Sequence, residues 1–486
     1  MKKVLFSITV IYFLFVSTQL SFGYLGKSIR LMGVGEELTG VIKDEYTDIY
    51  RNPAYLSFIE KIRIFGQYNL YQHPEVKIAG YFPNKETGLA GVVLPIAGYG
   101  NLALIGELKP STSEDNSARA SRTEYLDYYT LDSSSVEKFS KKTIQNFKAI
   151  YGLKLSASLR LGIDFVYLKN YNQNDSETKR ITTQRYFDSE NLKSYGIDDR
   201  VSNNDNSPDA QRGSIGMVLT ASQKTSLDLT LYYENLSYTS KGLSTSESQT
   251  KWFGADTTLR EGLSSYTLMA PTKEQAVGLD ANYKYLLPQN TTLAILLGGR
   301  YQKNEISSLS QNRDSSYSTP NFVSLGNSKN SLQYNNKVYS FVMGIGLEKD
   351  FSPSIKVGVV IKGYWDREKL DREEWKESSY IYMVDDSVTS SSSYFEEKIV
   401  RKTINSYKLN FPIGSELVLH KMIKARLGGM FSIERKGTET GYSTASKSYY
   451  SQGFGLSYDE RILLDAYIQN DFTLVKNWMV KVEYRF

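Results

Sequence analysis

The residues WMVKVEYRF, which run from Trp478 to Phe486, decide the fold class of this chain. Apolar and charged residues alternate along them. Because successive strand residues point to opposite faces, this stretch predicts a strand with one apolar and one charged face. An aromatic residue at the last position is typical of the strand that closes a bacterial outer-membrane barrel. We expect Trp478, Val480, Val482, Tyr484 and Phe486 to face lipid, and Lys481, Glu483 and Arg485 to face the lumen.

The other end of the chain predicts export. Lys2 and Lys3 precede a largely apolar run at residues 4–16, and Ser21–Gly23 supplies small residues for a cleavage site. This pattern predicts a Sec signal peptide over residues 1–23, because the apolar run is shorter than the ~20 residues of a spanning helix. An uncleaved N-terminal anchor helix is the alternative.

Alternating segments separated by two kinds of connection fill most of the remaining chain. After residue 23, no apolar run approaches the ~20 residues of a spanning helix, and only helices or closed barrels cross a bilayer. Short turns on one side and long loops on the other are typical of outer-membrane barrels. We therefore predict an all-β chain, a transmembrane antiparallel β-barrel over residues 59–486 with long extracellular loops. The short turns are expected at 84–87, 156–158, 223–225, 288–290, 352–354 and 420–422, and the long loops at 110–144, 172–210, 239–270, 304–336, 367–396 and 438–449.

The number of strands is less sharply defined by the pattern. Counting the alternating segments gives sixteen strands, an even number as expected for such a barrel, and fourteen stays open because short segments are easily miscounted. The segments lie near 61–71, 75–83, 88–109, 145–155, 159–171, 211–222, 225–238, 272–286, 290–303, 337–350, 354–366, 397–418, 423–437, 449–459, 461–468 and 477–486.

Residues 24–58 do not alternate, and they carry a set of polar, glycine and aromatic residues in a distinctive order. This order resembles that of the FadL-like superfamily of outer-membrane barrels, which includes long-chain fatty-acid and hydrocarbon transporters and PorV-like secretion components. Gly453–Ile468 also resembles the penultimate hairpin of that family. The matching N-terminal residues are Arg30, Met32, Gly33, Gly35, Asp44, Tyr50, Asn52, Pro53, Ala54 and Leu56.

The resemblance implies a fourteen-stranded barrel in which residues 24–58 fold inside as a hatch. By the same resemblance, the residues that shape the hatch or a ligand site are Arg30, Gly33, Gly35, Asp44, Asn52, Pro53 and Ala54. Asn-Pro-Ala suits a tight turn, because Asn caps readily and Pro fixes φ while removing a donor. A turn that merely redirects the chain from the hatch to the first strand is the alternative.

A second candidate lies in the sequence GVVLPIAGYGN, residues 91–101. Pro95 removes a ladder hydrogen bond, and Gly98 and Gly100 leave no side chain to pack, so the three predict a kink in the third strand. In the family that the chain resembles, a kink there opens a lateral exit from the lumen to lipid. An ordinary bulge or a short hairpin is the alternative.

Catalysis is not expected. The chain has no cysteine, and its two histidines, His73 and His420, fall at opposite ends of the predicted barrel. Cysteine-containing metal motifs are therefore excluded, and we predict no enzyme activity, no metal and no cofactor. The net charge of +5 argues neither for nor against nucleic acid, and basic residues interleaved with aromatic residues are not prominent, so no nucleic-acid partner is expected.

These observations predict a protein of the bacterial outer membrane, with outer-membrane lipid as one partner. The first hypothesis is uptake of hydrophobic small molecules, such as fatty acids or hydrocarbons, through the hatch and a lateral opening. The alternative is a PorV-like secretion or surface-attachment component that binds protein partners. A water-filled porin comes third. Apolar side chains near the hatch would favour uptake, whereas a wide polar vestibule would favour protein binding.

Overall fold

The computed structural model describes most of the chain from Leu38 onward. The predicted signal peptide at 1–23 and the residues Arg30, Gly33 and Gly35 lie outside the described residues. The described ranges are 38, 41–42, 44, 48–49, 51–71, 85–124, 128–186, 192–206, 209–252, 258–318, 322–384, 387–438, 441–458, 461–471 and 474–486.

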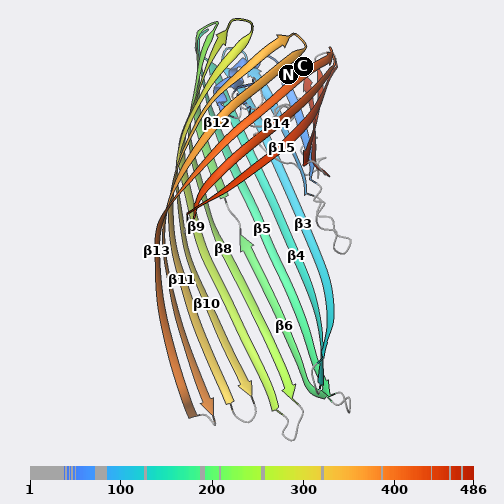
Figure 1. Ribbon diagram of the computed structural model, residues 1–486, viewed down its shortest axis with the longest axis vertical. Helices are drawn as coiled ribbons and strands as arrows, with labels where there is room; N and C mark the ends of the chain where they lie inside the picture. Colours follow the sequence, from blue (N-terminus) through green and yellow to red (C-terminus); the bar gives the residue numbers. More distant parts are fainter. Residues whose placement is uncertain are drawn as a thin grey trace.

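Strands make up nearly all of the described chain (Figure 1). One short 3₁₀ helix, η2, covers Pro53–Phe58. Among the described residues, no helix is both long and apolar enough to cross a membrane. The strands are β1 Arg63–Tyr71, β2 Lys85–Ile96, β3 Gly100–Glu124, β4 Tyr128–Lys154, β5 Leu159–Tyr186, β6 Leu192–Asn206, β7 Asp209–Ser222, β8 Thr225–Trp252, β9 Thr258–Leu287, β10 Thr291–Ser318, β11 Phe322–Ser352, β12 Ile355–Val384, β13 Ser387–His420, β14 Ile423–Thr438, β15 Gly441–Tyr458, β16 Ile462–Asp471 and β17 Leu474–Arg485.

The strands form one closed antiparallel barrel. Strands that follow one another in the chain pair with each other, apart from β6 and β7, and β1 pairs with both β2 and β17, which closes the ring. Strands β6 and β7 occupy one position in the wall, because β5 pairs with β6 along its distal part and with β7 nearer the turn. The described chain therefore crosses the wall sixteen times. The pattern count of sixteen is confirmed, and the fourteen implied by the resemblance is wrong.

The segment around Pro95 differs from the prediction. The single strand predicted over 88–109 is two strands, β2 and β3, joined by a turn at residues 97–99. Gly98 has φ +79 and Gly100 has φ +105, left-handed values that favour glycine, and Pro95 pairs with Asn101 beside the turn. These three residues therefore belong to a tight hairpin, not to a kink within a strand. A lateral opening at this place stays a prediction.

The neighbouring turn and strand were also placed differently. Residues 85–87 belong to β2, so the short turn predicted at 84–87 is wrong. The strand predicted at 75–83 lies outside the described residues. The other five short turns are confirmed, since each falls between two strands of the described chain.

The long polar segments are strands, not loops. The segment predicted as a loop at 110–144 instead continues β3 and β4, which stay paired in register as far as Glu124 and Tyr129. Most residues of the other predicted loops likewise belong to strands. Strand β13 reaches 34 residues, about 110 Å of extended chain. The prediction failed because both faces of these strands are largely polar, which removes the alternation that marks a strand with one buried face.

Beyond the barrel, these long strands continue as an open curved sheet, which we call the distal sheet (Figure 1). Among the described residues, β13 pairs with β14 only from Ser406 onward, and β3 pairs with β2 only as far as Leu108. The distal sheet therefore consists of β6 and of the parts of β3–β5 and β8–β13 past these points. Its edges are β3 from residue 109 and β13 up to residue 405.

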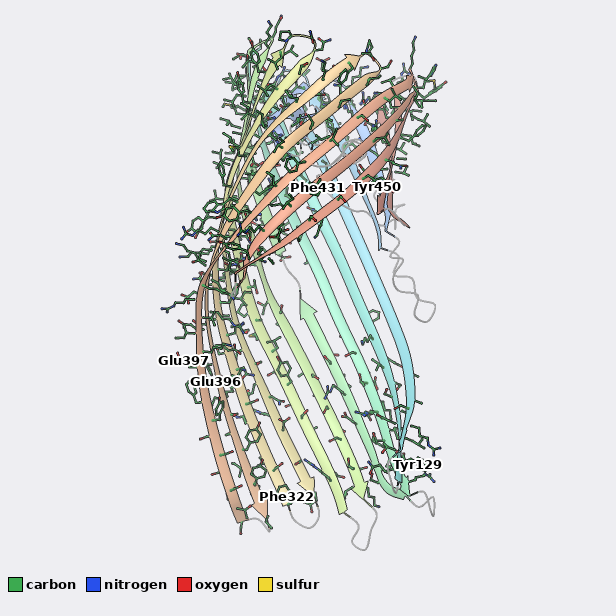
Figure 2. All side chains as sticks on the ribbon, in the orientation of Figure 1. Tyr129, Phe322, Glu396, Glu397, Phe431 and Tyr450 are labelled. Carbon is green, nitrogen blue, oxygen red and sulfur yellow. The ribbon has the colours of Figure 1, made fainter. Side chains whose placement is uncertain are left out.

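An outward apolar belt surrounds the barrel near its short turns. On β11, Phe341, Met343 and Ile345 are 45%, 58% and 53% exposed, and Figure 2 shows Phe431 in the same part of the molecule. The closing strand follows the predicted parity: Val482, Tyr484 and Phe486 are exposed, whereas Lys481 and Glu483 are buried. The side chain of Trp478 lies outside the described residues.

Candidate functional site

The described residues between Leu38 and Ile59, which we call the inner segment, lie inside the barrel against its lumen-facing wall. Asn52 begins η2 as its N-cap: the backbone is extended (φ −139), the side chain accepts from Ala54 N at 3.0 Å, and Pro53 follows. Proline at the first helical position is favourable because its missing N–H would have no helical partner there. Asn-Pro-Ala therefore forms a capped turn, as the sequence predicted.

The Asn52 side chain also binds the wall. It is fully buried, and its Nδ2 donates to the carbonyl oxygens of Met217 on β7 at 3.0 Å and Leu229 on β8 at 3.2 Å. Every polar atom of this amide therefore has a partner. A buried donor without an acceptor costs about 1–3 kcal/mol. Asparagine suits this position because its amide supplies two donors and one acceptor, and all three are used here.

Asp228 on β8 accepts hydrogen bonds from three side chains. Its Oδ2 accepts from the Tyr55 hydroxyl at 2.6 Å, from Arg51 Nη2 at 3.4 Å and from Asn282 Nδ2 of β9 at 3.3 Å. Asp228 is 2% exposed. Because two of these donors belong to the inner segment, we call the group of Asp228, Arg51, Tyr55 and Asn282 the carboxylate latch.

Two further wall residues bind the end of η2. Asn101 Nδ2 donates to the carbonyl oxygens of Leu56 and Ile59, both at 2.7 Å. Arg160 Nη1 donates to Ser57 O at 3.1 Å, and its guanidinium lies 3.6 Å from the centre of the Phe58 ring. Cationic stacking of this kind adds to the hydrogen bond.

A row of three glycines forms the floor on which the inner segment rests. Gly152 of β4 pairs with Gly162 of β5, which pairs with Gly216 of β7. A Cβ on Gly162 would lie 2.3 Å from Ala54 N, and one on Gly216 would lie 2.0 Å from Asn52 Oδ1. Only glycine permits the backbone of the inner segment to approach the wall this closely.

Two apolar clusters hold the inner segment on opposite sides. A buried leucine or isoleucine contributes about 1.5–3 kcal/mol, whereas a partly exposed ion pair contributes at most about 1 kcal/mol, so apolar packing dominates the seating of the segment. One cluster joins Leu38, Val41 and Ile42 to Ala294, Leu296 and Val360. The other joins Ile49, Leu56 and Ile59 to Phe65, Val93, Ala103, Ile105 and Ile150.

Elsewhere the lumen wall is strongly polar. Arg300 contacts Glu234 at 2.8 Å, and Lys148 contacts Asp164 at 2.8 Å. Nearer the closing strand, Arg426 joins Glu416 at 2.8 Å and Asp465 at 2.7 Å, and Glu483 binds Lys481 and Arg485. Charged side chains of opposite sign are thus paired along this part of the wall.

The structure brings together four of the sequence-predicted site residues. Asp44, Asn52, Pro53 and Ala54 are buried within the inner segment. Pro95, Gly98 and Gly100 lie apart from them at the β2–β3 turn.

Sequence reasoning missed the wall residues that hold the inner segment. The strongest of these are Asp228, Asn101, Arg160 and the glycine row. Each lies at a lumen-facing position of its strand, where a polar or glycine residue fits the alternation, but no local pattern marks it as a partner of the inner segment.

No metal centre is found in the described part of the chain, where no group of three or more His, Asp or Glu side chains is arranged to hold an ion. His420 ends β13, and its Nδ1 accepts from Met422 N at 3.3 Å, a turn contact. His73 lies outside the described residues.

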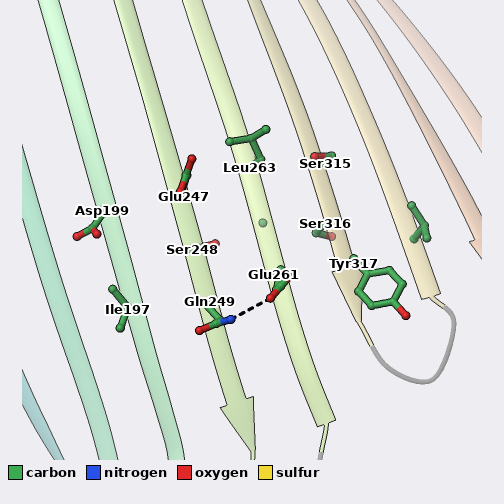
Figure 3. A pocket seen from close by; sticks show the side chains of 12 residues that line it. Ile197, Asp199, Glu247, Ser248, Gln249, Glu261, Leu263, Ser315, Ser316 and Tyr317 are labelled. Carbon is green, nitrogen blue, oxygen red and sulfur yellow. Dashed lines mark hydrogen bonds between the residues drawn. The ribbon is translucent and has the colours of Figure 1, made fainter.

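A separate cavity of about 590 Å³ lies on the distal sheet (Figure 3). Gln249 donates to Glu261 at 2.8 Å across its floor, and Leu263 and Tyr317 supply apolar surface. Its other lining residues include Asp199, Glu247 and Ser315. None of the residues that line it belongs to the inner segment or the carboxylate latch.

Comparison with family models gives no match for this chain, and comparison with curated proteins gives none either. Among solved structures, the chain is similar to the toluene transporter TodX of Pseudomonas putida, at 11% identity over 96% of this chain and 98% of that one, with a TM-score of 0.34.

Two further structures match over similar lengths. A FadL homologue of Pseudomonas aeruginosa is 8% identical over 96% of this chain and 100% of that one, with a TM-score of 0.36. The toluene transporter TbuX of Ralstonia pickettii is 11% identical over 95% of this chain and 98% of that one, with a TM-score of 0.33. The fold assignment itself rests on the strand pairing described above.

Proposed function

We propose that this chain is a bacterial outer-membrane barrel that takes up hydrophobic small molecules, with the inner segment as a movable hatch. The observation that carries the proposal is the seating of the inner segment across the lumen, held by two apolar clusters, the glycine row and the carboxylate latch. Displacing the segment would uncover apolar wall at Phe65, Ile105 and Ile150. Such a wall suits an apolar ligand, because burial of apolar surface drives binding.

The outward belt supports a place in a membrane. Apolar side chains alternate with lumen-facing residues over about the length of strand that a bilayer requires, as in known barrels. We therefore propose that the belt contacts outer-membrane lipid and that the distal sheet extends from the outer surface.

This placement predicts a depth-dependent effect of charge on β11. Ile345→Lys, in the middle of the belt, should lower the free energy of unfolding by about 2–4 kcal/mol. Leu325→Lys is the matched control, because it lies on the same outward face of the same strand but in the distal sheet, and it should cost about 0.5 kcal/mol or less. Denaturant unfolding in lipid vesicles measures both. Equal losses would show that the belt is not embedded.

Uptake itself is tested with the purified full chain. We expect mass spectrometry of the detergent extract to find a bound fatty acid, hydrocarbon or similar apolar compound, and proteoliposomes to accumulate such a compound faster than empty vesicles. The proposal would be refuted if no apolar compound is bound and if proteoliposomes accumulate such compounds no faster than empty vesicles.

The distal sheet favours a second candidate, a PorV-like component that binds protein partners. Among the residues that the structure describes, 387–405 of β13 pair with β12 alone, and Figure 2 shows Glu396 and Glu397 on this part of the strand. An exposed edge offers backbone groups to a partner strand. The same extraction distinguishes the candidates, because a protein partner in fixed ratio, with no bound apolar compound, would favour this second function.

A further inference from the structure

One face of the distal sheet continues the lumen wall. On β8 to β12, the side chains that contact the inner segment or the latch belong to even-numbered residues, such as Asp228, Asn282 and Leu296. The ladders that join these strands show no register shift between the barrel and residues 250, 260, 316, 324 and 380. Because side chains alternate between faces, even-numbered residues of the distal sheet lie on this same inner face.

Charge is scarce on the inner face at the tip of the distal sheet. In the four cross-strand rows of β8–β12 that end at residues 378, 380, 382 and 384 of β12, the described inner face carries one arginine, Arg260, and one acid, Asp314, and is otherwise mostly Ser, Gly and aromatic residues. Nearer the barrel, the same face of β12 carries both signs of charge at Arg372, Glu374 and Lys376. The scarcity of charge is therefore confined to the tip.

Aromatic rings lie on the inner face near its tip. A Cβ on Gly326 would lie 3.0 Å from Cε1 of Tyr380, so the glycine leaves room for the ring to lie across the sheet. Tyr380 is 42% exposed, which leaves ring surface open to solvent. Two residues along β12, Tyr382 packs beside Phe322 at 6.0 Å between ring centres and is itself 37% exposed.

Serine hydroxyl groups lie in the same cross-strand rows as these rings. Ser316 and Ser324 share a hydrogen bond at 2.6 Å, and both lie in the same cross-strand row as Tyr382. In the next row, Asp314 accepts from Asn312 at 2.9 Å and lies two strands from Tyr380, about 10 Å away. Hydrogen-bond donors and acceptors therefore lie within about 10 Å of the exposed rings of Tyr380 and Tyr382. One or two sugar rings can span this distance.

We propose that this inner face, at Asp314, Ser316, Ser324, Tyr380 and Tyr382, binds an uncharged glycan chain outside the cell. Exposed aromatic faces pack against the C–H faces of sugar rings, while serine hydroxyls and one carboxylate exchange hydrogen bonds with sugar hydroxyls. The scarcity of charge in these rows at the tip disfavours nucleic acid and charged polymers, which need a basic or acidic surface. This binding goes beyond the uptake proposed above and does not depend on it.

The test uses the full chain in detergent and three neutral probes, maltohexaose, cellohexaose and mannohexaose, with hyaluronan as a charged comparison. We expect calorimetry to detect at least one neutral probe, with an affinity that does not change between low and high salt. Tyr380→Ala and Tyr382→Ala should each weaken it about tenfold, because an exposed aromatic anchor carries much of such binding.

Tyr317→Ala is the matched control, because Tyr317 is also 42% exposed but lies on the outer face of β10. It should leave the affinity unchanged. Three results would overturn the proposal: no binding of any neutral probe, an equal loss in Tyr317→Ala, or tighter binding of hyaluronan. Uptake of apolar compounds by the same variants should stay unchanged, so failure here and failure of the uptake proposal are distinguishable.

Discussion

Replacing Gly162 with valine should unseat the inner segment and open the barrel. The new Cβ would lie 2.3 Å from Ala54 N and 2.3 Å from the Pro53 carbonyl carbon. Both are backbone atoms, which cannot rotate away as a long side chain could. Overpacking costs about 1–3 kcal/mol. A penalty of that size on the seated state raises the unseated population about 5- to 150-fold.

We expect the mean ion conductance of single barrels in planar bilayers to rise as the unseated population rises. The strand itself should survive, because valine favours strands and Gly162 already pairs on both sides. Proteolysis provides a second measurement, since an unseated inner segment should be cut more rapidly than a seated one.

Gly299→Val on β10 is the matched control. Nothing lies within 4 Å of the position that its Cβ would occupy, and it points away from the lumen. It should leave conductance and proteolysis unchanged. If Gly162→Val behaves like Gly299→Val, the inner segment is not seated on the glycine row.

The strands of the barrel were predictable wherever one face of a strand carries apolar residues and the other does not. Met343 and Ile345 alternate with small or polar residues, and the structure places both in the outward belt. The same rule gave the correct faces of Lys481 and Glu483. Alternation is a strong signal when one face is apolar, because a one-residue shift would exchange the faces.

The distal sheet escaped prediction for the opposite reason. Between residues 304 and 336, serine and asparagine occupy both faces of β10 and β11, so hydrophobic periodicity is absent although the ladder runs from Thr291 to Ser318 without a shift. Cross-strand contacts such as Ser316 to Ser324 join residues on different strands and leave no local pattern. Composition alone could not separate such strands from polar loops.

The inner segment was predictable in part. The order Asn52, Pro53 and Ala54 indicated a capped turn, because these residue types satisfy or remove backbone donors locally. Its wall partners were not predictable, since Asp228 and Asn101 lie far away in sequence and their pairing depends on the register of the whole barrel.

Replacing Asp228 with leucine should release the inner segment from the wall. The substitution removes the acceptor for the Tyr55 hydroxyl, Arg51 and Asn282 and leaves three donors facing an apolar side chain. Removing one partner of a buried charged group costs about 3–5 kcal/mol. Hydrogen exchange of the inner segment should therefore accelerate, and conductance should rise.

Asp228→Asn separates the loss of charge from the loss of the acceptor. The amide keeps the shape and one oxygen that can accept from Tyr55, so we expect a smaller effect, about 1–2 kcal/mol. Glu234→Leu tests whether any lumen-facing carboxylate on β8 would behave alike, because Glu234 pairs with Arg212 and Arg300 of the wall. It should leave exchange of the inner segment unchanged.

The three variants together distinguish a latch from a general loss of stability. A latch predicts faster exchange within the inner segment of Asp228→Leu, while amides of β10–β12 keep their protection, because the hydrogen bonds to Asp228 join the inner segment to β8 and β9. A stability defect would instead accelerate exchange across the barrel. If Asp228→Leu and Glu234→Leu accelerate the same amides equally, Asp228 supports the wall, and contacts other than the latch hold the inner segment.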